Sequence, residues 1–207
     1  MIEFYNTWNT SANKEQINSL ILVNFGMDLS NGIQLADLQA FADETLGVLY
    51  DEAGAPRNLV DSIDFYERVI EFYNAYQASS YKQQINDLIF VNFKGEDATE
   101  PLNLLDNNIS IDDLRAFGDK NLGVIYEDAN IVRDPVKAIK FYEEVIKFYD
   151  AYQLAGERSK IDAIFKIFTY RDKNGVEDPS RYLDLSNGKI DITDLWILGW
   201  YTEDDGY

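Results

Sequence analysis

Apolar residues recur with helical spacing along much of this chain, and segment 63–76 shows the pattern most clearly. Its charged residues fall on one side, and its apolar residues form a broad face on the other. A face this wide is typical of a helix that packs against more than one neighbour. Segment 136–152 repeats the pattern, so both segments are predicted to be buried helices. In the first segment the face has two adjacent stripes: Phe65, Val69, Phe72 and Tyr76, and beside them Tyr66, Ile70 and Tyr73.

The helical pattern belongs to a longer internal repeat, of which the chain contains three copies. IEFYN begins at Ile2 and at Ile70, and the related IKFYD begins at Ile146. The periods are therefore 68 and 76 residues (70−2 and 146−70). Each copy continues through an apolar run into a loop with the sequence LSNGIQLADL, LDNNISIDDL or LSNGKIDITDL. Tandem copies of this kind indicate units that stack and bury a shared core.

The repeat predicts the fold class and the organisation of the chain. We expect an all-α protein with about three helices in each unit, stacked as in a solenoid to form one continuous domain. The polar insertions 94–101 and 171–180 are expected in surface loops. Met1 stands inside a pattern that is a continuous helix in the other copies, which indicates a shortened first unit or a fragment of a longer protein. After Leu195 the apolar pattern fades into acidic residues, as a terminal capping unit requires. The predicted units are residues 1–69, residues 70–145 and, as the capping copy, residues 146–207.

Composition removes many kinds of chemistry. The chain has no His and no Cys, which excludes disulfides, thiol or histidine catalysis, and the usual ligands of zinc, haem and iron–sulfur clusters. Adjacent acidic pairs such as Glu143 and Glu144 point about 100° apart on a helix and do not form the facing pair of a glycosidase. The sequence therefore predicts a protein that is not an enzyme.

Charge and hydropathy narrow the choice of partners. The 37 acidic residues against 18 basic ones give a net charge of −19, which repels nucleic-acid phosphates and anionic membranes. No apolar stretch reaches the roughly 20 residues that span a bilayer, and no signal-peptide pattern is visible. We therefore expect a protein partner or a second copy of the chain, without direct phosphate contacts or membrane insertion. The compartment stays open, because the chain fits a cytoplasmic protein or a fragment excised from a larger one.

Two segments resemble the helix-turn-helix of Sel1-like and tetratricopeptide repeats. They are LGVLYDEAGAPRNLVDSIDFYERV at 46–69 and LGVIYEDANIVRDPVKAIKFYEEV at 122–145. In the second segment, Gly123 and Ala138 match the small residues at which the helices of this family cross, and the aromatic pair at Phe141 matches the residues that fill the gap. The resemblance implies stacked helices and a role in scaffolding protein–protein interactions.

The loop LDLSNGKIDITDLWIL at 183–198 resembles the calcium-binding loops of EF-hand and dockerin proteins, with an apolar run before it and a predicted helix after it. This resemblance implies Ca²⁺ as a cofactor held by oxygen ligands in the three copies. Leu183 and Leu185 occupy the positions where the first and third ligands would stand. The implied ligands are Asp28, Ser30 and Asp37 in the first copy, Asp106, Ser110 and Asp113 in the second, and Asn187, Asp191 and Asp194 in the third.

Helix capping is an alternative explanation for the same residues. Ser110 and Asp113, like Asp191 and Asp194, have the spacing of a capping box, in which each side chain accepts a hydrogen bond from the backbone N–H of the other. Capping accounts for most of the residues that the loops share, whereas the extra acidity of the loops favours calcium. The sequence leaves both interpretations open.

Together these patterns predict a binding or assembly scaffold built from helical repeats, with calcium stiffening its loops. A second hypothesis is an acidic inhibitor or DNA mimic, whose negative surface binds a basic partner. A third is end-to-end self-association of the repeats. The predicted partner is accordingly another protein or another copy of the chain.

Overall fold

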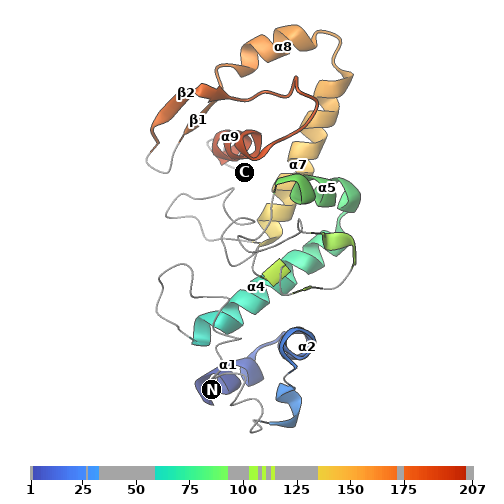
Figure 1. Ribbon diagram of the computed structural model, residues 1–207, viewed down its shortest axis with the longest axis vertical. Coiled ribbons are helices and arrows are strands. Elements are labelled where there is room, and N and C mark those ends of the chain that lie inside the picture. The colour runs from blue at the N-terminus through green and yellow to red at the C-terminus, as the bar shows by residue number, and fades with distance from the viewer. Residues whose placement is uncertain are drawn as a thin grey trace.

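The computed structural model describes eight stretches of the chain, and most of the residues in them are helical. These stretches contain seven α-helices and one two-stranded sheet, and 70% of their residues lie in helices (Figure 1). The predicted ligand Asp37, the insertion 94–101 and the first halves of the two tetratricopeptide-like segments lie outside them. The described residues are 2–26, 28–32, 59–92, 103–106, 109–110, 113–114, 135–171 and 175–203.

Six of these helices form three pairs, each joined by a short turn, which we call hairpins 1, 2 and 3. The turn has the same geometry each time, because the backbone N–H of Ser11, Ser79 or Ala155 donates to the carbonyl three residues earlier at 3.0 or 3.1 Å. These residues share one position of the sequence repeat, so the turn is repeated in structure as well. The pairs are α1 (Ile2–Thr10) with α2 (Lys14–Phe25), α4 (Leu59–Ala78) with α5 (Lys82–Asn92), and α7 (Pro135–Leu154) with α8 (Arg158–Phe165).

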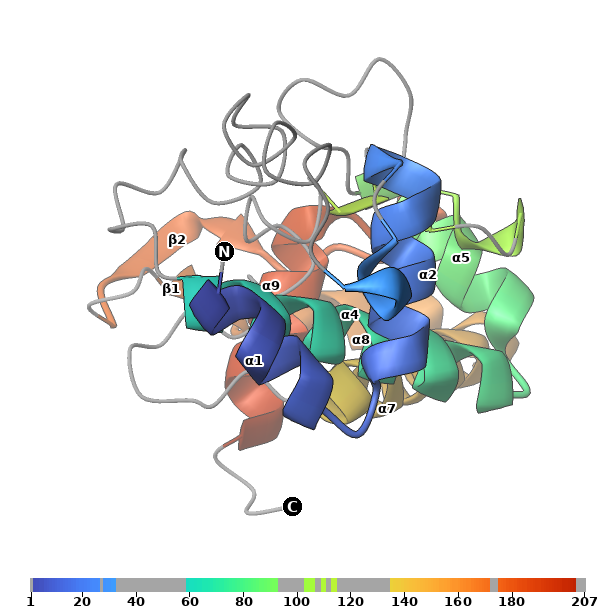
Figure 2. The ribbon, with the colours of Figure 1, turned by 90° about the horizontal axis from the view of Figure 1, so that it is seen from below.

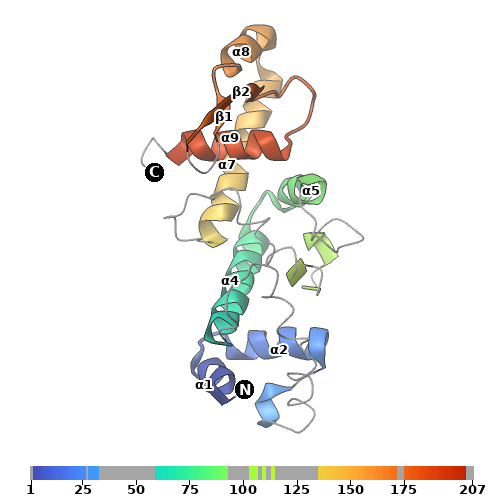
Figure 3. The ribbon, with the colours of Figure 1, turned by 60° about the vertical axis from the view of Figure 1, so that its left-hand side comes forward.

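The three hairpins follow one another along the long axis of the molecule (Figures 1 and 3). Helix α1 packs against α4 and α4 against α7, while α2 and α5 each contact the first helix of the following hairpin. Figure 2 shows this order end on, with α1 in front of α4. The repeat boundaries expected after residues 69 and 145 lie inside α4 and α7. Each of these long helices therefore belongs to two successive copies of the sequence repeat.

The broad apolar faces predicted for the two long helices are buried. All seven stripe residues of α4 are at most 8% exposed. In α7 the equivalent residues are buried as well, apart from Tyr149, which is half-buried, and Phe148, which is exposed. The prediction of two buried helices is confirmed, with Phe148 as the exception. None of the described helices is both long enough and apolar enough to cross a membrane.

One part of the chain departs from the all-α prediction. Strands β1 (Thr169–Arg171) and β2 (Glu177–Tyr182) pair in an antiparallel hairpin, with Tyr170 opposite Asp178. Most of this hairpin lies in the insertion 171–180, for which the sequence predicts a surface loop. The fold is therefore mostly α, and the expectation of a purely helical protein is wrong at this insertion.

Aromatic contacts explain why the insertion forms strands. The ring of Tyr170 stacks on Trp196 of helix α9 (Ile192–Glu203), with 5.4 Å between ring centroids and 28° between planes. The guanidinium group of Arg181 lies 3.9 Å from the centroid of the Tyr170 ring. Stacking and cation–π attraction of this kind hold the strand pair against α9. The composition of the insertion does not indicate these contacts, because Tyr170 and Trp196 lie outside the insertion.

Phe72→Ala is expected to lower the free energy of unfolding by about 3–5 kcal/mol, because it empties a fully enclosed site. Phe148 stands at the same repeat position, yet it is 37% exposed against 1% for Phe72. Phe148→Ala should therefore lower stability by about 1 kcal/mol or less. Urea denaturation followed by circular dichroism measures both changes. Equal losses in the two variants would contradict the packing described for α4 and α7.

Candidate functional site

The loops at 28–32, 103–106 and 183–190 each contain a side chain that accepts a hydrogen bond from the backbone N–H two residues later. The Oδ1 atom of Asp28 accepts hydrogen bonds from the Ser30 N–H at 3.1 Å and the Ser30 hydroxyl at 2.5 Å. Asp184 accepts the same two hydrogen bonds from Ser186, at 3.1 and 2.5 Å. In the second loop, the side-chain oxygen of Asn103 accepts from the N–H two residues later at 3.3 Å. These three residues therefore occupy the same place in the three loops.

This structural equivalence shifts the second loop by one residue relative to the alignment made from the sequence. The sequence pairs Leu29 with Leu105, the first residue of LDNNISIDDL, whereas Leu104 takes the place of Leu29 in the structure. The backbone N–H of Leu29 donates to the side-chain oxygen of Asn18 at 2.6 Å, and that of Leu104 donates to Asn86 at 2.7 Å. Both leucines are buried, whereas Leu105 is exposed. An asparagine on the second helix thus anchors each of the first two loops.

The third loop is anchored differently. Asp162 stands where the first two hairpins have asparagine, and it accepts a hydrogen bond from the Tyr152 hydroxyl at 2.7 Å. This bond, with smaller effects of burial and of the Asp162 charge, raises the pKa of Tyr152 to about 12. The Oδ1 atom of Asp194 instead accepts from the backbone N–H of Asp184 at 3.0 Å, which ties the third loop to helix α9.

Two of the loops end in complete capping boxes. The Ser110 hydroxyl accepts from the Asp113 N–H at 3.2 Å, while Asp113 Oδ2 accepts from the Ser110 N–H at 2.7 Å. Asp191 Oδ1 accepts from the Asp194 N–H at 3.1 Å, while Asp194 Oδ2 accepts from the Asp191 N–H at 3.0 Å. Each box satisfies two backbone donors at the start of a helix. The capping interpretation of these four residues is confirmed.

Asp194 is a buried acid, only 2% exposed. Burial raises its pKa to about 6, because the charged form loses contact with water, and the charges of Asp191 and Asp184 act in the same direction. The hydrogen bonds from the backbone of these two residues lower the pKa and are outweighed. The charge of Asp194 therefore changes closer to neutral pH than that of an ordinary aspartate.

Several of the described residues implied as calcium ligands have other hydrogen-bond partners in the structure. Donors from Ser30, Asn18 and Asn31 surround Asp28 and hold its pKa below the usual value, with the Ser30 hydroxyl bond as the largest cause. Asn187 Oδ1 accepts from a backbone N–H of its own turn at 2.9 Å. Asp106 lies in a short 3-10 helix, η3 (Leu104–Asp106).

The pattern that implies calcium has not brought the acidic residues together. Within the described stretches, no group of three or more acidic side chains is placed to hold a metal ion. Leu183 and Leu185, at the positions of the first and third ligands, are buried core residues. The carboxylates that are described cap helices and brace turns, and the calcium site stays a prediction.

Two polar contacts between hairpins recur in the structure, and the sequence analysis missed both. The Ser11 hydroxyl donates to Glu67 Oε1, and the Ser79 hydroxyl donates to Glu143 Oε1 at 2.5 Å. In each case a serine at the turn of one hairpin binds a glutamate on the first helix of the next. We call these contacts, with those in the next paragraph, the inter-hairpin links.

The second pair of links joins the second helix of one hairpin to the loop that follows the next hairpin. Asn24 Nδ2 donates to the carbonyl oxygen of Ile109 at 2.9 Å, and Asn92 Nδ2 donates to that of Ile190 at 3.0 Å. The signal for these contacts was in the sequence, because serine and asparagine recur at the same positions of the first two copies. The third copy has Ala155 and Phe168 there.

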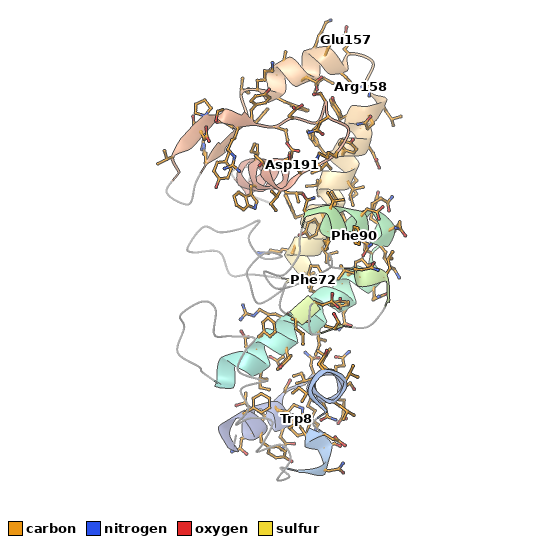
Figure 4. All side chains as sticks on the ribbon, in the orientation of Figure 1. Trp8, Phe72, Phe90, Glu157, Arg158 and Asp191 are labelled. Carbon is orange, nitrogen blue, oxygen red and sulfur yellow. The ribbon has the colours of Figure 1, made fainter. Side chains whose placement is uncertain are left out.

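Helices α2 and α5 expose apolar side chains at equivalent positions. Leu22 and Val23 on α2 are 44% and 74% exposed, and Phe90 and Val91 on α5 are 45% and 64% exposed. Each pair lies 68 residues from its counterpart, which is the repeat period. Both helices lie on the same side of α4 (Figures 1 and 3), and Phe90 is marked in Figure 4. We call these four residues the α2–α5 ridge.

Comparison with known proteins adds no relative to this description. No protein-family model, curated protein or solved structure matches the chain. The function must therefore be argued from the side chains described above.

Wild-type protein is expected to gain stability relative to Asp194→Asn as the pH falls from about 7 to about 4. The folded protein binds a proton at Asp194 near pH 6, whereas the unfolded chain binds it near the ordinary aspartate pKa of 3.8. Acidification therefore protonates the folded state first, and the gain is roughly 2–3 kcal/mol. Urea unfolding of both proteins across this range measures it. Acidification also weakens the repulsion among the other carboxylates, but it does so in both proteins. A stability difference between wild-type protein and Asp194→Asn that does not change with pH would therefore contradict the raised pKa of Asp194.

The caps predict that the loops do not need calcium to hold their shape. The melting temperature should shift by the same small amount with about 1 mM CaCl₂ and with about 1 mM MgCl₂, because a site specific for calcium would stabilise the folded state further. Differential scanning calorimetry of chelator-treated protein measures the shifts. A clearly larger shift with calcium would support the ligands that the sequence implies.

Proposed function

We propose that this protein is a non-enzymatic scaffold for binding or assembly, built from three helical units stacked in a short solenoid. The observation that carries the proposal is the α2–α5 ridge. The ridge places apolar side chains in water at the same position of successive units, where a partner can contact both units at once.

Stacking of the units is supported by contacts that repeat along the chain. Both serine links and both asparagine links join equivalent atoms, although they lie in different hairpins. The turns within the three hairpins are also alike. Units that meet in the same way at each junction build a regular array, which is the arrangement of solenoid scaffolds.

Binding at the ridge is supported by the energetics of exposed apolar surface. Contact with water costs roughly 25 cal/mol for each Å² of apolar area, and a partner that covers the ridge removes this cost. Single exposed apolar residues are ordinary, whereas groups of them mark interaction sites. The ridge has two such residues on each of two helices at equivalent repeat positions, next to the buried Ile21 and Ile89 in sequence.

Charge adds a preference to this surface. With a net charge of −19, the chain attracts a partner that carries basic residues around its apolar anchors. The attraction speeds encounter, while the apolar contacts supply most of the lifetime of the complex. An acidic inhibitor would instead bind through charge alone, so the two modes respond differently to changes in the ridge.

A library of displayed amphipathic helical peptides, selected on the wild-type protein, tests the ridge. Selected peptides are expected to bind Val23→Glu/Val91→Glu at least tenfold more weakly, because charge disrupts apolar contact. The matched control is Gln16→Glu/Gln84→Glu, which adds the same charge at exposed positions that also lie 68 residues apart and should leave affinity within about twofold. Affinities are measured by surface plasmon resonance.

Two outcomes would reject the ridge. One is a selection that yields no peptide with saturable binding. The other is a set of peptides that binds all three proteins alike and is released as salt rises from about 50 to about 500 mM, because screening removes binding by exposed charge. The second outcome would favour the acidic inhibitor.

A further inference from the structure

The outer side of hairpin 3 exposes apolar residues at positions that hairpins 1 and 2 bury or half-bury. Phe4 and Phe72 are each 1% exposed, whereas Phe148 at the same repeat position is 37% exposed. On the second helix, Leu20 is buried and Leu88 is half-buried, whereas their counterpart Ile164 is 57% exposed. In hairpins 1 and 2 the next hairpin packs close by, and hairpin 3 has no described hairpin after it.

The inter-hairpin links show that these positions face the neighbouring unit. Asn24 stands four residues after Leu20, so the two share one side of α2, and Asn24 reaches across to Ile109 of the next unit. In the third copy Ile164 stands on α8 at the position of Leu20, whereas Phe168, at the position of Asn24, follows the end of α8 and packs partly buried against the core. That side of hairpin 3 is therefore the side on which a further unit would pack.

The polar donors of the links are missing from this side of hairpin 3. Ala155 replaces the serine at the turn, and Phe168 replaces the asparagine. The side is more apolar than its counterparts, whereas a unit that caps a stack needs a polar outer face. We call Phe148, Ala155 and Ile164 the end face. It continues an interface that is already used twice in the molecule.

The charge beside the end face differs from that of the rest of the chain. Residues 157–168 carry three basic and two acidic side chains, a net charge of +1 (3−2), in a chain of −19. Arg158, Lys160 and Lys166 are all exposed. Figure 4 shows Glu157 and Arg158 at the tip of the molecule, beside the turn of hairpin 3. A partner with acidic residues suits this surface.

We propose that the end face binds an acidic amphipathic helix of another protein, seated as α4 is seated on hairpin 1 and α7 on hairpin 2. The occupant needs a broad aliphatic and aromatic stripe, because it must cover Phe148 and Ile164. It needs no glutamate to accept from a serine, because Ala155 has no hydroxyl. This site differs from the α2–α5 ridge in place and in the charge of its partner, and it does not depend on the ridge.

A peptide with the sequence of residues 59–78, the α4 helix, is a suitable probe. It carries the seven-residue apolar face and a net charge of −3 (1−4). Fluorescence anisotropy of the labelled peptide with the full-length protein is expected to show saturable binding with a Kd on the order of 1–100 μM. Ile164→Glu should weaken binding at least tenfold, whereas Val91→Glu on the ridge should leave it unchanged. A peptide with Ile63→Ser and Ile70→Ser should not bind, because these buried residues share the side of α4 on which Glu67 contacts hairpin 1.

Circular dichroism checks that Ile164→Glu is folded, which its exposed position favours. Absence of saturable binding overturns the proposal, as does binding that survives Ile164→Glu or falls equally with Val91→Glu. The mass of the wild-type protein in solution is measured by light scattering at several concentrations. A mass that rises with concentration and returns to the monomer value in Ile164→Glu would assign the end face to a second copy of this chain and overturn the proposal of a different partner.

Discussion

Helices α4 and α7 have apolar faces that are too wide for one neighbour to cover, and the rest of the structure is arranged to cover them. Burying the seven stripe residues of α4 contributes roughly 10–20 kcal/mol before conformational entropy is subtracted. A hydrogen bond between hairpins contributes on the order of 1 kcal/mol. Packing of the long helices therefore provides most of the stability, and the inter-hairpin links determine which residues of adjacent hairpins meet. At Phe148 the apolar face of α7 is no longer fully covered.

The parts of the structure that depend on nearby residues could be predicted from the sequence. The stripes of α4 follow from a spacing of three or four residues, and the box of Asp191 and Asp194 follows from contacts within one helical turn. The alignment of the loops could not be predicted correctly, because a chance identity between residues paired Leu105 with Leu29. The N–H bond to Asn86 shows instead that Leu104 is the equivalent residue. Alignment of identical residues cannot detect such a shift, because it carries no information on which backbone N–H donates to which side chain.

Contacts between distant residues could not be predicted. Ser11 binds a glutamate 56 residues away, and Asn24 binds a carbonyl 85 residues away. The strands at 169–182 depend on a ring of α9 that lies outside the insertion. The acidity of the loops was also ambiguous, because a carboxylate that accepts from backbone N–H groups and one that binds a cation belong to the same residue types. Geometry separates these roles, and for Asp113, Asp191 and Asp194 it assigns the helix cap.

The continuity of α4 and α7 across the boundaries of the sequence repeat has a mechanical consequence. Each helix has 20 residues and is about 30 Å long, and no flexible linker interrupts it where one copy passes into the next. Because α4 packs against both α1 and α7, this one rigid helix sets the distance between hairpins 1 and 3. A partner of the proposed scaffold that contacts more than one hairpin must therefore have contact points with a matching spacing.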